Sequence, residues 1–250
     1  MPVLRLTLAY DGTDFHGFAR QPRVRTVEGV LTEALSRVLT TPPKLSVAGR
    51  TDAGVHAEGQ VVSFEADAEP ERLQRALNGR LAPEVVVSES RLAPEGFDAR
   101  HSATGREYRY RIRSGLLPDP FSARYEWHRP GTHALGAMRQ AARDLVGEHD
   151  FRSFCRADGR STVRKLTRLS VRRQGDLLEI GAGADGFLHQ MVRSLVGTLV
   201  EVGEGNRDPA SMPVVLASRS RQAAGRVAPS RGLTLVRVHY GAHPRRAGSP

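Results

Sequence analysis

The sequence predicts an α+β protein made of two halves that share one element order, β-α-β-β-α-β. Alternating apolar and polar residues mark the strands, and apolar residues at helical spacing mark the helices between them. The second half of the 250 residues repeats the order of the first. Two such units are typical of ferredoxin-like halves with antiparallel sheets, and we expect them to form a central cleft.

The first half opens with a half-buried strand over residues 4–10. Leucines at every second position from Leu4 to Leu8 alternate with Arg5 and Thr7, which is the pattern of a strand with one face in the core. The Asp-Gly-Thr sequence that follows is typical of a turn.

A helix is expected over residues 27–39. Its apolar residues recur at helical spacing, and Thr26 stands at the N-cap position. Pro42 and Pro43 end it, because proline cannot continue a helix.

Three strands and a helix complete the first half. They are strands over residues 44–48 and 60–65, with a glycine-flanked loop between them, then a helix over 70–79 and a strand over 84–92.

The second half begins with a strand over residues 106–112, in which Tyr108, Tyr110 and Ile112 alternate with charged residues. One extra short helix is inserted before the final strand. The remaining elements are a helix over 133–146, strands over 163–172 and 177–183, helices over 186–202 and 210–219, and a strand over 233–240.

The boundary between the halves should lie near residues 98–105. We expect an N-terminal half over 1–103, a C-terminal half over 104–240, and a disordered polar tail over 241–250.

Composition indicates a globular protein with a polyanionic partner. Hydrophobic residues make up 39% of the chain, and the formal net charge is +10, which favours nucleic acid as the partner. Nearly all basic residues are arginine, whose planar guanidinium group can bind phosphate and stack on bases. Codon bias in a GC-rich genome also explains the choice of arginine over lysine, but it does not explain the excess of positive charge.

Several classes of protein are disfavoured. The single cysteine, Cys155, excludes an internal disulfide and favours a reducing compartment, so a cytoplasmic location is expected. The sequence contains no metal-binding motif, which predicts no dedicated metal site. It contains no apolar run of membrane-spanning length and no signal-peptide pattern, so no membrane partner is expected.

The first candidate site is the loop GRTDAGVHA, in which Gly49 and Gly54 bracket Asp52. Glycines permit tight turns and close approach of a ligand to the backbone, so the loop presents Asp52 with Arg50 and His56 beside it. The structural alternative is a polar connection in which Asp52 caps its own turn.

The second candidate is Arg193, the only fully charged residue in the apolar stretch 187–200. It shares a helix flank with Gly197, which indicates close packing there, and a largely buried arginine needs a carboxylate or a phosphate. A structural ion pair or a solvent-facing side chain is the alternative.

The third candidate is Tyr108, on a strand flanked by Arg106, Arg109, Arg111 and Arg113. Aromatic and arginine side chains on a sheet can stack bases and hold phosphates. A half-buried strand with a basic solvent face is the alternative.

The segment 181–186 matches G-x-G-x-x-G after a strand and before a helix, a pattern found in dinucleotide sites. However, such a motif should open a parallel βαβ unit and be followed by a strand ending in an acidic residue, and this one is not. Close packing is the better interpretation, and a dinucleotide-dependent oxidoreductase is disfavoured.

Motifs along most of the chain resemble those of the tRNA pseudouridine synthases of the TruA type. The resemblance covers residues 3 to about 240. Its strongest element is GRTDAGVHAEGQVVSF, and the others, in order, are YDGT with FHGF, FDAR with SAT, REYRY, GEHDF, FLHQMVR and APSRGL.

The resemblance implies isomerisation of uridine to pseudouridine in the anticodon stem-loop of tRNA, at tRNA positions 38, 39 and 40. It implies Asp52 as the catalytic residue, Tyr108 in contact with the target base, Arg193 paired with the aspartate, and Arg50 helping to displace the base. It also implies a homodimer, with RNA bound across both subunits, and no metal or organic cofactor.

Three positions depart from the usual family pattern. Asp98 and Ser63 stand where the family often has histidine, and Ala19 with Arg20 replaces part of a polar stretch. None belongs to the Asp52, Tyr108 and Arg193 set, so they bear on RNA contacts and not on the reaction.

The proposed chemistry requires a uridine flipped out of its stack, because the enzyme must reach the C1′–N1 bond. A paired Arg193 would favour the charged carboxylate of Asp52, so the two halves should meet at this site. A non-catalytic RNA-binding protein using the same basic surface is the alternative. The sequence leaves open whether Asp52 attacks C1′, adds to the base or abstracts the C2′ proton.

Overall fold

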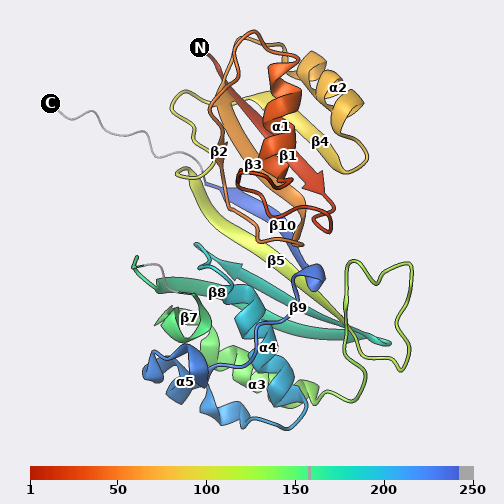
Figure 1. Ribbon diagram of the computed structural model, residues 1–250. Helices are drawn as coiled ribbons and strands as arrows, with labels where there is room; N and C mark the ends of the chain where they lie inside the picture. The colour runs from red at the N-terminus through yellow and green to blue at the C-terminus, as the bar shows by residue number, and fades with distance from the viewer. Residues whose placement is uncertain (157–158, 242–250) are drawn as a thin grey trace, which may run out of the picture.

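The computed structural model describes residues 1–156 and 159–241 (Figure 1). Its first half contains β1 (Val3–Tyr10), α1 (Val27–Ser36), β2 (Ser46–Val47), β3 (His56–Glu65), α2 (Pro70–Leu81) and β4 (Val85–Leu92). Its second half contains β5 (Ala103–Arg113), β6 (Trp127–His128), α3 (Leu135–Leu145), β7 (Gly147–Asp150), β8 (Val163–Gln174), β9 (Leu177–Ala184), α4 (Met191–Gly203), α5 (Met212–Ser218) and β10 (Leu233–Tyr240). Short 3-10 turns lie at Phe151–Phe154, Pro209–Ser211, Arg221–Ala223 and Ser230–Gly232.

The strands form one ten-stranded sheet, with the order β4-β1-β3-β10-β5-β9-β8-β7 along its main path. Most neighbouring pairs are antiparallel, as expected, but the halves do not keep separate sheets. Strand β10 runs parallel to β3 through Thr234 and Leu235 and antiparallel to β5. The last strand of the second half therefore joins the two halves at the centre of the sheet (Figure 1).

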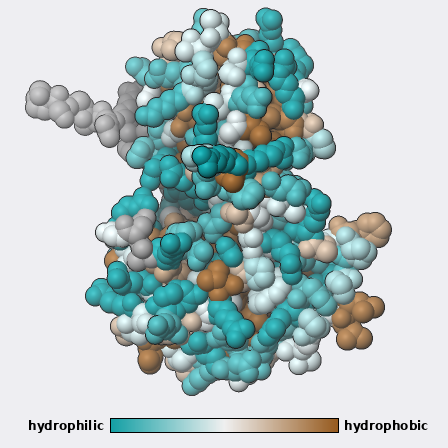
Figure 2. All heavy atoms as spheres, viewed as in Figure 1, coloured by the Kyte–Doolittle hydropathy of each residue, from teal (hydrophilic) through white to brown (hydrophobic). Residues whose placement is uncertain are grey.

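The core lies where alternating residues of the strands meet the helices. In β1, buried and partly exposed residues alternate along the whole strand, and in β5 the alternation buries Tyr108, Tyr110 and Ile112. Helices α1 and α2 cover the first half and α3 and α4 the second (Figure 1). The surface narrows between these two lobes, and mostly hydrophilic residues cover this waist in the view of Figure 2.

Local signals placed most element boundaries correctly. Thr26 caps α1, since its side chain accepts a hydrogen bond from Gly29 N, and α2 begins with Pro70 at its first turn. Helix α1 ends at Ser36, earlier than predicted, because the chain continues in a turn.

Four expectations about the strands and α4 were wrong in detail. The strand predicted over 44–48 is only the two residues of β2, and β3 starts at His56 instead of residue 60. Strand β7 was missed because its sequence, GEHD, has no apolar alternation. Helix α4 starts at Met191 instead of residue 186, because Gln190 adopts a left-handed conformation with φ 62°.

No helix in the described ranges 1–156 and 159–241 is long and apolar enough to span a membrane. The polar tail predicted over 241–250 lies outside the described residues from position 242 onward.

Candidate active site

A cavity of about 1040 Å³ lies between the two halves. The first half contributes residues from β2 and the loop after it. The second half contributes Tyr108 of β5 and the segment that leads into α4. Asp52, Tyr108, Arg50 and Arg193 all line this cavity, so the fold brings the four predicted site residues together.

The loop of residues 49–56, here the aspartate loop, is fixed by backbone and side-chain hydrogen bonds from its own half. Phe18 N donates to Thr51 O at 3.0 Å, and Gly54 N donates to Phe15 O at 3.2 Å. The hydroxyls of Tyr10 and Thr51 lie 2.8 Å apart in a buried hydrogen bond. Burial raises the pKa of Tyr10 to about 12, so its phenol stays neutral in this contact.

His56 ends the aspartate loop and ties it to both halves. Its side chain is buried, and Nδ1 accepts a hydrogen bond from Gly12 N at 3.0 Å. Nε2 lies 3.1 Å from the carbonyl oxygen of Arg231 in the second half, to which it can donate. His56 of the aspartate loop therefore has a structural role at the junction.

Of the two glycines in the aspartate loop, Gly54 serves close approach of the chain itself, whereas a Cβ on Gly49 would meet only the Tyr108 hydroxyl, at 3.9 Å. Gly54 has φ 74°, a conformation that side chains disfavour, and a Cβ there would lie 2.6 Å from Oγ of Ser230. The loop therefore packs directly on the second half.

Asp52 and Arg193 form an ion pair across the halves. Arg193 Nη1 lies 3.2 Å from Oδ2 of Asp52. Arg193 Nε donates to Ala228 O at 2.7 Å, and its side chain is only 16% exposed. A guanidinium fixed in this way holds the carboxylate of Asp52 at a defined position.

Close packing on α4 explains the glycine beside Arg193. A Cβ on Gly197 would lie 1.7 Å from the carbonyl oxygen of Arg226. The chain around Ala228 therefore crosses directly over α4, and Ala228 N also donates to Arg193 O at 3.1 Å. The close packing predicted from this glycine is confirmed.

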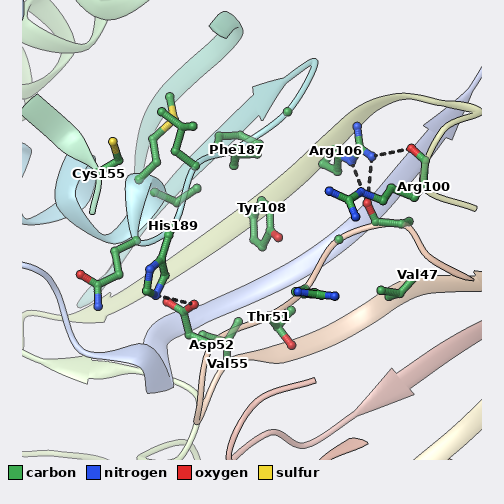
Figure 3. Close-up of a pocket in the computed structure, with 18 of the residues that line it drawn as sticks. Val47, Thr51, Asp52, Val55, Arg100, Arg106, Tyr108, Cys155, Phe187 and His189 are labelled. Carbon is green, nitrogen blue, oxygen red and sulfur yellow. Dashed lines mark hydrogen bonds and ion pairs between the residues drawn. The ribbon is translucent and has the colours of Figure 1, made fainter. Parts of the chain in front are cut away.

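The segment of residues 187–193, here the facing segment, supplies three side chains to the site. Phe187 packs edge to face on Tyr108, with ring centroids 5.1 Å apart. His189 Nε2 lies 3.5 Å from Oδ1 of Asp52 (Figure 3), and Arg193 reaches Oδ2.

Tyr108 forms part of the cavity wall between these two segments (Figure 3). Burial raises the pKa of Tyr108, and the nearby charge of Asp52 adds to the effect. The phenol therefore stays neutral well above the pH at which an ordinary tyrosine ionises. Its hydroxyl makes no hydrogen bond to any residue within 1–156 or 159–241. The ring and hydroxyl are thus available to a ligand.

Two arginines at the cavity differ in their surroundings. Arg50 is exposed and has no ion-pair or hydrogen-bond partner in the part of the chain that the structure describes. Arg106 is held by carbonyl oxygens of both halves, donating to Ala48 O at 2.8 Å and Asp185 O at 2.7 Å. Burial lowers the pKa of Arg106.

The cavity carries a strong positive excess. Its acidic lining residues are Glu28, Asp52 and Asp98. Its lysine and arginine residues are Lys44, Arg50, Arg100, Arg106, Arg156, Arg160, Arg164 and Arg193. A carboxylate paired with an arginine in a basic cleft suits acid-base or nucleophilic chemistry on a polyanion.

The positions that depart from the family pattern have local structural roles. Ser63 Oγ accepts a hydrogen bond from Ala99 N at 2.9 Å. Although burial opposes it, hydrogen bonds such as that from His101 N lower the pKa of Asp98. Neither residue contacts Asp52.

Sequence reasoning missed His189 and the anchors of the aspartate loop. His189 was assigned to a helix, where an exposed histidine gives no signal. The segment 181–186 is not a phosphate-binding turn, because Gly181 and Gly183 lie inside β9, packed under side chains of β8.

Comparisons with known proteins identify relatives over nearly the whole chain. The profile of a family described as tRNA pseudouridine synthase matches residues 7–100 and 141–241. A protein of Methylobacterium nodulans named tRNA pseudouridine synthase A is 44% identical over 246 residues, covering 96% of both chains. A protein of the same name from Moorella thermoacetica is 44% identical, covering 96% of this chain and 100% of its own. Another from Frankia casuarinae is 48% identical, covering 98% of this chain and 91% of its own.

Proposed function

The chain belongs to the tRNA pseudouridine synthase family, and from that premise we propose that Asp52 is the catalytic residue of the cleft between its halves. The enzyme is an isomerase that converts uridine in tRNA to pseudouridine. The observation that carries the assignment of Asp52 is its ion pair with Arg193 across the two halves, at 3.2 Å.

The reaction moves the bond between ribose and base. The C1′–N1 bond breaks, the base turns, a C5–C1′ bond forms, the hydrogen on C5 leaves as a proton, and N1 takes up a proton. Either an attack by Asp52 or a proton transfer to it uses the ionised carboxylate, whose Oδ2 lies 3.2 Å from Nη1 of Arg193.

Tyr108 and Arg50 complete the proposed site. The target uridine must leave its stack to reach Asp52, and the Tyr108 ring can pack on the flipped base while its unpaired hydroxyl meets a polar edge. Arg50 is exposed beside the cavity, where its side chain can fill the space that the base vacates.

We infer that the target lies in the anticodon stem-loop, at tRNA positions 38, 39 and 40, as the family resemblance implies. The basic lining of the cavity supports an RNA that enters along its backbone. The same resemblance supports a homodimer that binds RNA across both subunits, and the single buried cysteine fits a cytoplasmic enzyme.

We also infer that the two halves are ferredoxin-like. In the second half the order β10-β5-β9-β8 is antiparallel throughout. In the first half β4, β1, β3 and β2 pair in the same manner. This repetition supports two related units that place the site at their junction.

Release of tritium from tRNA containing 5-tritiated uridine tests the catalytic proposal, because the C5 hydrogen is lost in the reaction. The substrates should carry a single uridine among positions 38, 39 and 40. We expect Asp52→Asn to slow release by at least about a thousandfold. tRNA binding, measured by filter retention, should change by less than about threefold, because the basic surface is intact.

Asp144→Asn is the matched control, since Asp144 is an exposed residue of α3, and it should behave as the wild type. Release by Asp52→Asn at the wild-type rate would refute the role of Asp52. Binding without release by the wild type would indicate a non-catalytic RNA-binding protein.

A further inference from the structure

The two carboxylate oxygens of Asp52 have unlike partners. Oδ2 faces Arg193, which is 16% exposed and anchored on Ala228 O at 2.7 Å. Oδ1 faces His189 Nε2 at 3.5 Å, and the His189 side chain is 45% exposed. A ligand can displace the exposed imidazole without disturbing the fixed ion pair, so Oδ1 is the oxygen that a substrate can reach.

The backbone beside His189 is held in an uncommon conformation. Gln190 has φ 62° and ψ 7°, which costs a residue other than glycine about 1 kcal/mol or more. The turn separates His189 from α4, and His189 O accepts a hydrogen bond from Arg156 N at 3.1 Å. As a result, His189 and Arg193 approach the same carboxylate from two positions.

The His189 imidazole lines the same cavity as Asp52 and Tyr108. Figure 3 shows His189 and Asp52 facing each other at the cavity, with Tyr108 beyond them. The charged residues near His189 are Asp52 of the aspartate loop, Arg193 of α4 and Arg156 after the 3-10 turn Phe151–Phe154. An imidazole N–H can donate to a phosphate oxygen or a ribose hydroxyl as well as to a carboxylate.

We propose that His189 is a substrate-positioning residue. Its imidazole covers Oδ1 of Asp52 in the free enzyme and moves to contact the ribose-phosphate of the flipped-out uridine. The nucleotide thereby takes the place of the imidazole at Oδ1, and the imidazole holds the nucleotide there. The proposal rests on the proposed function of Asp52, and it names the part of the substrate that His189 contacts.

Steady-state tritium release by His189→Ala and His189→Gln tests this role. The contact forms only after the base has flipped, so its loss should lower kcat and not tRNA affinity. We expect His189→Ala to lower kcat about tenfold with KM for tRNA changed less than about twofold. His189→Gln keeps a neutral donor and should recover kcat to within about threefold of the wild type.

His16→Gln is the matched control, because His16 is an exposed histidine that does not line the cavity. Its kcat should equal that of the wild type. The melting temperatures of all three variants should stay within about 2 °C of the wild type, since both histidines are exposed.

Unchanged kcat in His189→Ala, an equal loss in the alanine and glutamine variants, or an effect on KM alone would each overturn the proposal. Its failure is distinguishable from failure of the proposed function. The latter is seen as absence of release by the wild type or full release by Asp52→Asn, whatever the His189 variants do.

Discussion

The aspartate loop and the facing segment meet across the same cavity but are built differently. The aspartate loop is tied through its backbone, at Thr51 by Phe18 N and at Gly54 by Phe15 O. The facing segment contributes mainly side chains, because Phe187, His189 and Arg193 all reach across to the site.

This difference separates two tasks of an active site. The aspartate loop fixes where the carboxylate is, since its hydrogen bonds leave the backbone little freedom. The facing segment determines what surrounds the carboxylate, since it supplies the guanidinium, the imidazole and one aromatic wall. Substitutions in the loop should therefore alter position and stability, whereas substitutions in the segment should alter turnover alone.

Among substitutions around the aspartate, Arg193→Gln should have the largest effect and should act on turnover. Removing the charge that faces Oδ2 should lower kcat about 100-fold while the melting temperature changes little. Arg193→Lys should recover only part of the loss, because one ammonium cannot reach both Asp52 and Ala228 O as the guanidinium does. Equal rates for the lysine variant and the wild type would show that charge alone suffices.

Gly12→Ala should act on position and stability. A Cβ on Gly12 would lie 2.0 Å from the carbonyl oxygen of Val55, which is backbone of the aspartate loop. We expect a loss of about 2 kcal/mol in the free energy of unfolding, measured by urea denaturation, together with reduced kcat.

Gly136→Ala is the matched control for this substitution, because nothing lies within 4 Å of the added Cβ on α3. It should be neutral or stabilising. Equal stability of the Gly12 variant and the wild type would mean that the loop can move to accommodate a side chain.

Thr51→Val should have a smaller effect of the same kind. It removes the hydroxyl that pairs with the buried Tyr10 hydroxyl at 2.8 Å. The expected loss is about 1 kcal/mol in the free energy of unfolding. The double variant Tyr10→Phe/Thr51→Val should lose less than the two single losses added together, because no unpaired hydroxyl remains. Additive losses would indicate that the hydroxyls do not interact.

Tyr108 should contribute no pH dependence in the alkaline range. Burial raises its pKa, so the neutral phenol persists above the pH at which an ordinary tyrosine ionises, about 10. The ratio of kcat for the wild type to kcat for Tyr108→Phe should therefore be constant between about pH 8 and 10. A ratio that falls toward one with rising pH would indicate that Tyr108 ionises within that range.

Some of this site is predictable from local sequence. A single charge in the apolar stretch of α4 indicates that Arg193 needs a partner, and two glycines around Asp52 indicate a presented loop. Thr26 and Pro70 likewise mark helix starts, because caps act within one turn.

The remainder depends on contacts between residues far apart in the chain. The pairing of β10 with β3 at Leu235 and Ala57 leaves no local pattern, because any strand edge offers the same backbone groups. The left-handed conformation of Gln190 is also set by its surroundings, since its residue type favours a helix. His189 was missed for this reason.

A double-mutant cycle on Asp52 and Arg193 tests most directly whether the two halves build one catalytic unit. Single-turnover tritium release, with enzyme in excess, should be measured for Asp52→Asn, Arg193→Gln and the double variant. If Arg193 acts through the charge of Asp52, Arg193→Gln slows the wild type about 100-fold but slows Asp52→Asn less than about twofold. Losses that multiply in the double variant would contradict the account, because the two residues would then act independently.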